Sequence, residues 1–231
     1  MSRTLPTQTI IRFSKWKIHT MKKRNYLYPV ILLLYIAPLS ANAQSINTYQ
    51  STFSGPLKNW AQTFTHFNLT HFKQVSKRYP FENINSVKVK SKATFFPGYK
   101  SALCTSPNGQ YVIDIYSYLL LEKKNGKFTS TGSDVEQNIT LGNIPERSWK
   151  RIDYFGYAQR AQKVCWINND TFILAAARLN KVNRNIPVII IGHIKTQSLT
   201  TFETTNPDCY QKPGSYTSPK LIALHIQVKD H

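Results

Sequence analysis

The chain has 231 residues and a formal net charge of +19, from 30 Lys and Arg against 11 Asp and Glu. The length fits one domain with a sizeable core and leaves little room for a second. The charge is compatible with contact to nucleic acid, contact to an anionic envelope surface, or solubility alone.

Residues 21–44 have the three-part layout of a secretory signal peptide. A basic segment, Lys22 to Arg24, precedes an apolar run from Tyr26 to Leu39, and Ala41-Asn42-Ala43 is a small-x-small cleavage site. The apolar run is shorter than the roughly 20 residues of a membrane span. We therefore expect residues 21–43 to be a signal peptide that is removed. The alternative is an N-terminal anchor that is never cut.

The leader divides the chain into three parts. Residues 1–20 precede a good start at Met21 and are interpreted as an upstream extension, and residues 44–231 as a single β-rich domain. That domain keeps 23 basic and 11 acidic residues, a net charge of +12. An exported protein rarely meets nucleic acid, so we predict no nucleic-acid partner and no membrane span after cleavage, with a periplasmic or secreted location.

The domain begins with a predicted helix near residues 56–78. Pro56 suits a first helical turn, and an apolar stripe follows a period near 3.6 residues. The stripe consists of Leu57, Trp60, Ala61, Phe64, Phe67, Phe72 and Val75. Packing on a sheet is the simplest role for this aromatic stripe, and a ligand groove is the alternative.

Beyond Pro80 the period changes to two. Residues 86–96 alternate apolar positions with Lys88, Lys90 and Lys92, which predicts a strand with one solvated face. Further strands are predicted at 110–124, 135–141, 149–158, 171–179, 187–196, 198–204 and 220–228. Turn residues join them, and Asn125-Gly126 is a strong hairpin signal. The fold class is therefore mainly β, with antiparallel sheets and one N-terminal helix.

Three cysteines, Cys104, Cys165 and Cys209, follow the leader. An oxidising compartment favours one disulfide and one free thiol. Cys104 and Cys165 are the candidate pair because they occupy matching places in two similar segments, "LCTSPNGQYVIDIYS" at 103–117 and "VCWINNDTFILAAAR" at 164–178. The alternative is that both are small buried hydrophobic residues.

These segments also carry a resemblance. "SPNGQYVIDIY" resembles the Ser-Pro-Asp-Gly turn and strand of WD40-like and TolB-type β-propeller repeats, with Asn108 in place of Asp. "CWINNDTFIL" and "PVIIIGHIKTQSLTTF" are similar to further parts of such a unit, so the resemblance covers about residues 101–205. It implies blade-like antiparallel sheets. The offset of 61 residues exceeds the usual ~40–45, so an incomplete propeller or an ordinary sandwich is expected.

Few residues are candidates for catalysis. Asp114 and Asp153 lie inside apolar strands and His193 lies in "IIIGHIKT", and each is either catalytic or simply hydrogen-bonded. The sequence contains no phosphate loop, serine elbow, zinc pattern or dinucleotide fingerprint, so no cofactor or metal is predicted.

The resulting hypothesis is an exported, non-enzymatic, β-rich binding protein of the bacterial envelope. Its partner is an unknown protein or an anionic envelope polymer. The alternative is a hydrolase that acts on an anionic envelope substrate, and this needs at least two of Asp114, Asp153 and His193 in one cleft.

Overall fold

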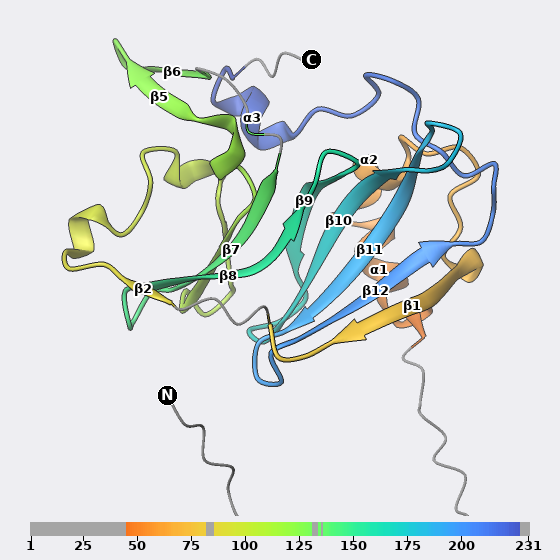
Figure 1. The fold of residues 1–231 in the computed structure, drawn as a ribbon, viewed down its shortest axis with the longest axis horizontal. Helices are drawn as coiled ribbons and strands as arrows, with labels where there is room; N and C mark the ends of the chain where they lie inside the picture. Colours follow the sequence, from red (N-terminus) through yellow and green to blue (C-terminus); the bar gives the residue numbers. More distant parts are fainter. Residues whose placement is uncertain (1–44, 82–85, 131–133, 135, 227–231) are drawn as a thin grey trace, which may run out of the picture. The chain divides into compact units, whose positions relative to one another are not determined.

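The computed structural model describes residues 45–81, 86–130, 134 and 136–226. These residues form a mainly β structure in which the described strands belong to two five-stranded antiparallel sheets and one hairpin (Figure 1). Neither sheet closes into a barrel. The predicted fold class, antiparallel β with a short N-terminal helix, is confirmed. The predicted leader and upstream extension lie outside the described residues.

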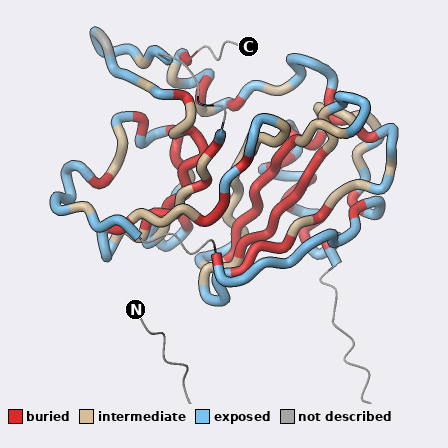
Figure 2. Tube along the Cα trace, in the orientation of Figure 1, coloured by how far each residue is buried: buried red, intermediate tan, exposed pale blue. Residues whose placement is uncertain are grey.

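Sheet A has the strand order β1-β12-β11-β10-β9, and every neighbouring pair is antiparallel. Its strands are β1 (Phe72–Arg78), β9 (Gln159–Trp166), β10 (Thr171–Leu179), β11 (Asn185–His193) and β12 (Ser198–Thr204). Buried positions run along β10 and β11 (Figure 2), because these central strands are covered on both faces.

Sheet B has the strand order β2-β8-β7-β4-β3 and is also antiparallel. Its strands are β2 (Val87–Lys88), β3 (Cys104–Thr105), β4 (Tyr111–Asp114), β7 (Gln137–Asn143) and β8 (Ser148–Phe155). The separate hairpin joins β5 (Leu121–Lys124) to β6 (Lys127–Ser130). Its turn residues Asn125 and Gly126 both have positive φ, 50° and 78°, as the predicted two-residue hairpin requires.

Short helical turns complete the described chain. They are η1 (Ile46–Tyr49), α1 (Gln50–Ser54), α2 (Lys58–Ala61), η2 (Leu69–His71), η3 (Lys92–Thr94), η4 (Lys100–Ala102), η5 (Ser117–Leu119) and α3 (Pro219–Ala223). Figure 1 shows α1 and α2 against one face of sheet A. The start of the predicted apolar stripe packs there as expected, because Leu57, Trp60 and Phe64 are buried in a cluster with the residues of β10 and β11 that face the helices.

Four sequence-based assignments are wrong. The strand predicted at 110–124 is two strands, β4 and β5, separated by the helical turn η5. The predicted helix over 56–78 ends at Ala61, and residues 72–78 form the edge strand β1, in which Phe72 is buried but Val75 is 53% exposed. The strand predicted at 86–96 survives only as β2, and the strand predicted at 220–228 begins as α3. The sequence also did not predict β9, whose polar residues hide its alternation.

The two sheets repeat one arrangement. Strands β3-β4-β7-β8 and β9-β10-β11-β12 each form a four-stranded meander in the same order. In both meanders, the turn between the third and fourth strands is hydrogen-bonded to the loop between the first and second strands. Ile144 N donates to Gln110 O in one, and Ile194 N donates to Asp170 O in the other, each at 2.8 Å. The sequence similarity between the two segments therefore coincides with a structural repeat.

The first hairpin explains the offset between the two units. Asn108 Oδ1 accepts a hydrogen bond from the backbone N–H two residues later, and Asn168 Oδ1 does the same in the second unit. The loop that joins the two paired strands of this hairpin spans residues 106–111 in sheet B and residues 167–171 in sheet A. The loop in sheet A is therefore one residue shorter. The offset is therefore 61 at the cysteines and 60 beyond the loop, so Val112, and not Tyr111, corresponds to Phe172.

The two sheets pack face to face in the same orientation, and a chain segment covers each outer face of the pair. The face of sheet A that contains Phe172 and Leu199 packs into the core shared with sheet B, and its other face packs on the N-terminal helices. The equivalent face of sheet B, at Gly142 and Trp149, is covered by residues 92–103, where the Phe95 ring stacks on Trp149 at 5.1 Å between centroids. The order of layers is therefore covering segment, sheet B, sheet A and helices.

One buried amide joins the two sheets directly. Gln137, in β7 of sheet B, is fully buried, and its Oε1 accepts from the backbone N–H of Ala161 in β9 at 2.6 Å. Its Nε2 donates to the carbonyl oxygens of Ala161 and Ile115, at 3.0 and 2.8 Å. Since a buried amide is costly unless it is hydrogen-bonded, these bonds fix the relative position of the sheets.

Candidate functional site

Asp114 is a buried structural carboxylate. Its Oδ2 accepts a hydrogen bond from the Tyr99 hydroxyl at 2.8 Å, and its Oδ1 accepts from the backbone N–H of Tyr116 at 2.6 Å. Burial raises the pKa of Asp114 above its ordinary value, although both hydrogen bonds act in the opposite direction. The carboxylate therefore orders the turn that follows β4.

Asp153 joins the outer strands of the two sheets. Its Oδ1 lies 2.7 Å from Nη2 of Arg78, at the end of β1, and also accepts from the backbone N–H of Tyr154 at 2.9 Å. The side chain of Asp153 is 6% exposed, and that of Arg78 is 52% exposed. This placement fits a structural ion pair.

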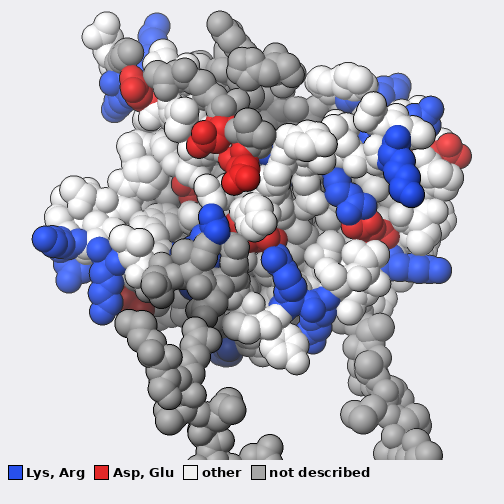
Figure 3. All heavy atoms as spheres, in the orientation of Figure 1, with Lys and Arg blue, Asp and Glu red and all other residues white. Residues whose placement is uncertain are grey.

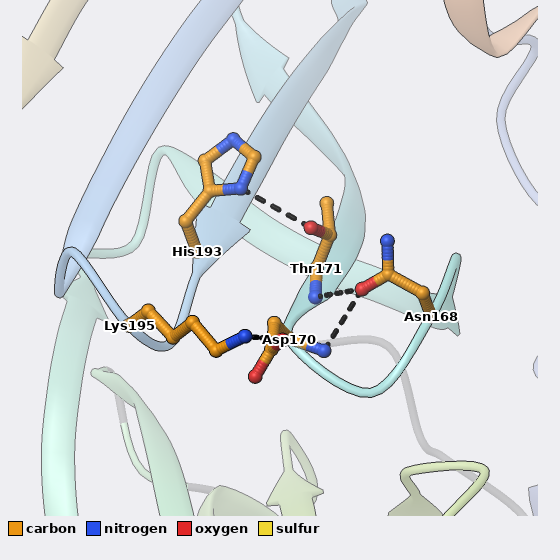
Figure 4. Close-up of polar contacts among 5 residues, drawn as sticks. All are labelled: Asn168, Asp170, Thr171, His193 and Lys195. Carbon is orange, nitrogen blue, oxygen red and sulfur yellow. Dashed lines mark hydrogen bonds and ion pairs between the residues drawn. The ribbon is translucent and has the colours of Figure 1, made fainter.

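His193 lies at the end of β11 in an open hollow of about 380 Å³ (Figure 4). Its Nδ1 is 3.2 Å from the hydroxyl of Thr171. Desolvation lowers the pKa of His193, and the charge of Lys77 lowers it further. The neighbouring carboxylate, Asp170, is engaged elsewhere, because its Oδ2 pairs with Lys195 Nζ at 2.8 Å. The contacts in Figure 4 therefore give His193 no carboxylate partner.

The three predicted candidates do not share a cleft around His193. Its hollow is lined by residues of β1, β11, β12 and adjacent turns, and neither Asp114 nor Asp153 is among them. Because side chains alternate along a strand, His193 is in phase with Ile189 and Ile191, which pack on the N-terminal helices. His193 is thus on the face of sheet A that is turned away from sheet B, the sheet that contains both aspartates.

The predicted disulfide is absent, because all three cysteines are free thiols. Cys104 in β3 and Cys165 in β9 are on adjoining strands of different sheets, and their thiols point to different backbone carbonyls. The Cys104 thiol is 3.5 Å from Val164 O, and the Cys165 thiol is 3.6 Å from Trp166 O. Burial raises the pKa of both thiols, so each is held in the protonated form.

The seam between β3 and β9 contains a cavity of about 230 Å³, called here the seam cavity. Trp166 Nε1 closes one end of this seam by donating to Cys104 O at 3.0 Å. Five aliphatic residues line the cavity: Ala102, Ile113, Ile115, Val164 and Pro219. Such a mostly apolar hollow with a few polar groups has the composition of a small-molecule site.

The polar wall of the seam cavity comes from four separate chain segments. It consists of Cys104, Tyr116, Lys163, Ser218 and Lys220. The hydroxyls of Tyr116 and Ser218 are 2.7 Å apart, and burial raises the pKa of Tyr116 to about 12, so this hydroxyl stays protonated. Burial lowers the pKa of Lys220 from its ordinary value.

A larger groove of about 720 Å³ adjoins the seam cavity. The two share Tyr116 and Ser218 in their walls. Polar and aromatic side chains of the groove include Tyr118, Arg160, Tyr216 and His225. An apolar inner space therefore opens toward a polar outer one, which suits a ligand with both characters.

On the face drawn in Figure 3, the surface charge marks no single groove for a polymer. Figure 3 shows Lys and Arg side chains spread over the visible face with Asp and Glu among them.

Within residues 45–81, 86–130, 134 and 136–226, no helix combines the length and apolar character needed to cross a membrane. In that same part of the chain, no group of three or more His, Cys, Asp or Glu is arranged to hold a metal ion.

Comparisons with known proteins assign no family. No family model matches the chain, and no curated protein matches its sequence. A crystal structure from Clostridium novyi NT, described only provisionally as that of a conserved lipoprotein, is similar over 60% of this chain and 68% of its own, with 13% identity and a TM-score of 0.28. A likeness this weak carries no argument about fold or function.

Sequence reasoning missed the polar wall of the seam cavity. Lys163 belongs to β9, which was not predicted, and Lys220 belongs to α3, which was assigned to a strand. No local sequence pattern marks either lysine. The two are far apart in the sequence and come together only in the folded chain. Cys104 was singled out, but as half of a disulfide.

Proposed function

We propose that this protein is an exported, β-rich binding protein of the bacterial envelope that holds a small, largely apolar ligand in the seam cavity. The observation that carries the proposal is the mostly apolar cavity between β3, β9 and α3, which shares Tyr116 and Ser218 with the wall of the polar groove. Cavities of this kind occur where two packed units meet. Residues 21–43 support export to the periplasm or the medium.

The alternative hydrolase has less support. Asp114 and Asp153 are each committed to structural hydrogen bonds or an ion pair, and His193 faces the other side of sheet A. Contact with an anionic envelope polymer is a secondary role, favoured by the net charge of residues 44–231 and by the scattered lysines.

We also propose that the two stacked meanders are propeller-type blades of the WD40-like or TolB kind. The same strand order, the Asn-bound first hairpin and the shared third turn support a duplicated unit. The resemblance is limited to these short segments, and the stack holds two such units.

The intact mass of the protein purified from the envelope fraction tests export. We expect a chain that begins at Gln44, because the apolar run ends just before the Ala41-Asn42-Ala43 site. Electrospray mass spectrometry resolves this form from one that begins at Met1 or Met21. A protein that keeps either methionine and stays in the cytoplasm would contradict the proposed location.

Binding of N-phenyl-1-naphthylamine, a neutral apolar fluorescent probe, tests the seam cavity. We expect saturable binding to the purified protein and its loss in Val164→Phe, which places a larger ring in the cavity. Val182→Phe is the matched control, because Val182 is 68% exposed and lies outside the cavity wall. Equal binding by all three proteins would show that the probe occupies another surface and would remove the support for a ligand site.

A further inference from the structure

Two lysines, Lys163 and Lys220, line the seam cavity. Lys163 Nζ donates to the carbonyl oxygen of Pro56, and Lys220 Nζ donates to that of Leu103. Carbonyl oxygens satisfy one donor of each ammonium, but they carry no formal charge, and each ammonium has three donors. Two donors of each lysine are therefore left for another partner.

Among the described residues that line this cavity there is no Asp or Glu. Within the described part of the chain, neither Lys163 nor Lys220 forms an ion pair, whereas Lys195, Arg78 and Arg178 each do. Both lysines are half-buried, and the loss of hydration on burial disfavours the charged form of a lysine. Burial and the nearby charge of Lys163 lower the pKa of Lys220, which is the response expected of an uncompensated ammonium.

The hydroxyl pair supplies a further donor at the mouth of the cavity. In the contact between Tyr116 and Ser218 one O–H donates to the other oxygen, so the second O–H remains able to donate. The wall of the seam cavity therefore combines the two lysines with this pair of hydroxyls. The aliphatic wall, from Ile113, Ile115 and Val164, receives the apolar remainder of the molecule.

We infer that the seam cavity selects an anionic amphiphile, a short aliphatic chain with a single anionic head group that lies between Lys163 and Lys220. This inference rests on the proposed function, because it names the ligand class of the same site. The chain fills the apolar space, and the head group supplies a counter-charge that none of the described wall residues provides. Charge-assisted hydrogen bonds from the two ammonium groups hold the head group in place.

Octanoate and 1-octanol form a matched pair that separates head group from chain. Isothermal titration calorimetry on the purified protein is expected to show octanoate binding at least about ten-fold more tightly than 1-octanol, because only octanoate pairs with the lysines. Lys220→Met and Lys163→Met keep most of the length of the side chain and remove its charge. Each is expected to weaken octanoate about ten-fold and to leave 1-octanol unchanged.

Lys195→Met is the control, because it removes a surface lysine that is paired with Asp170 and lies outside the cavity. It should change the affinity for neither ligand. Equal affinities for octanoate and 1-octanol, or octanoate binding that survives both cavity variants, would overturn the inference and leave the binding function intact. If neither compound binds, the proposed function fails as well. Two lysine variants are used so that the result does not depend on the folding of one.

Discussion

Trp60→Ala is expected to lower the free energy of unfolding by about 3–5 kcal/mol, which is typical of a buried aromatic residue replaced by alanine. Trp60 is fully buried between the N-terminal helices and sheet A, and its ring meets Phe64 edge to face at 4.9 Å. Its Nε1 donates to Gln162 Oε1 at 2.8 Å, which ties α2 to β9. Urea denaturation followed by circular dichroism measures the effect.

Trp60→Phe is the matched variant for this prediction. It keeps most of the apolar contact and removes only the N–H bond, so a smaller loss of about 1 kcal/mol is expected. Gln162 keeps a partner in this variant, because Gln211 Nε2 also donates to Gln162 Oε1, at 3.2 Å. Equal losses in the two variants would show that the hydrogen bond, and not the packing of the ring, holds the helices on the sheet.

Gly192→Ala is expected to destabilise the protein by about 1–3 kcal/mol through overpacking. Gly192 lies opposite Phe172 in the β10–β11 ladder, and the Phe172 ring lies directly over its Cα. A Cβ at Gly192 would lie 2.0 Å from Cζ of that ring. The ring has nowhere to move, because Phe172 is fully buried and packs edge to face on Trp166 at 5.4 Å.

Two further variants separate this clash from the general cost of changing a glycine. Gly156→Ala should be nearly neutral in the same urea titration, because a Cβ there meets no atom within 4 Å. Phe172→Leu shortens the opposing side chain, so Gly192→Ala should cost less in that background than in the wild type. Additive losses in the double variant would show that the ring is not the source of the strain.

Strands with a clear local pattern were predictable from the sequence. Residues 171–179 and 198–204 were assigned to strands with the bounds that β10 and β12 have. Both are rich in apolar or β-branched residues and are bounded by turn residues. The repeat was also visible, since the matching cysteines mark the strands β3 and β9 that adjoin at the seam.

Tertiary context decided the segments that were wrong. The i, i+3 spacing of Phe72 and Val75 favours a helix. Pairing with β12 nevertheless selects a strand, in which Phe72 is buried and Val75 is exposed. Residues 220–228, "KLIALHIQV", are rich in apolar residues and were expected to form a strand, yet Pro219 starts a short helix there. The seam cavity has no sequence signature at all, because its walls come from segments that only the stacking of the sheets brings together.

The two equivalent sheets are stacked face to face, and each outer face of this stack is covered by a chain segment. A face that accepts a neighbouring sheet is present at each level of the stack, so the arrangement has no intrinsic limit on its length. The N-terminal helices and residues 92–103 occupy the places that further sheets would take. Without these covers, the contact that joins the two sheets within one chain could join one chain to the next, head to tail, as an open filament. The covering segments thus act as terminators that keep an internal packing surface from becoming an external one.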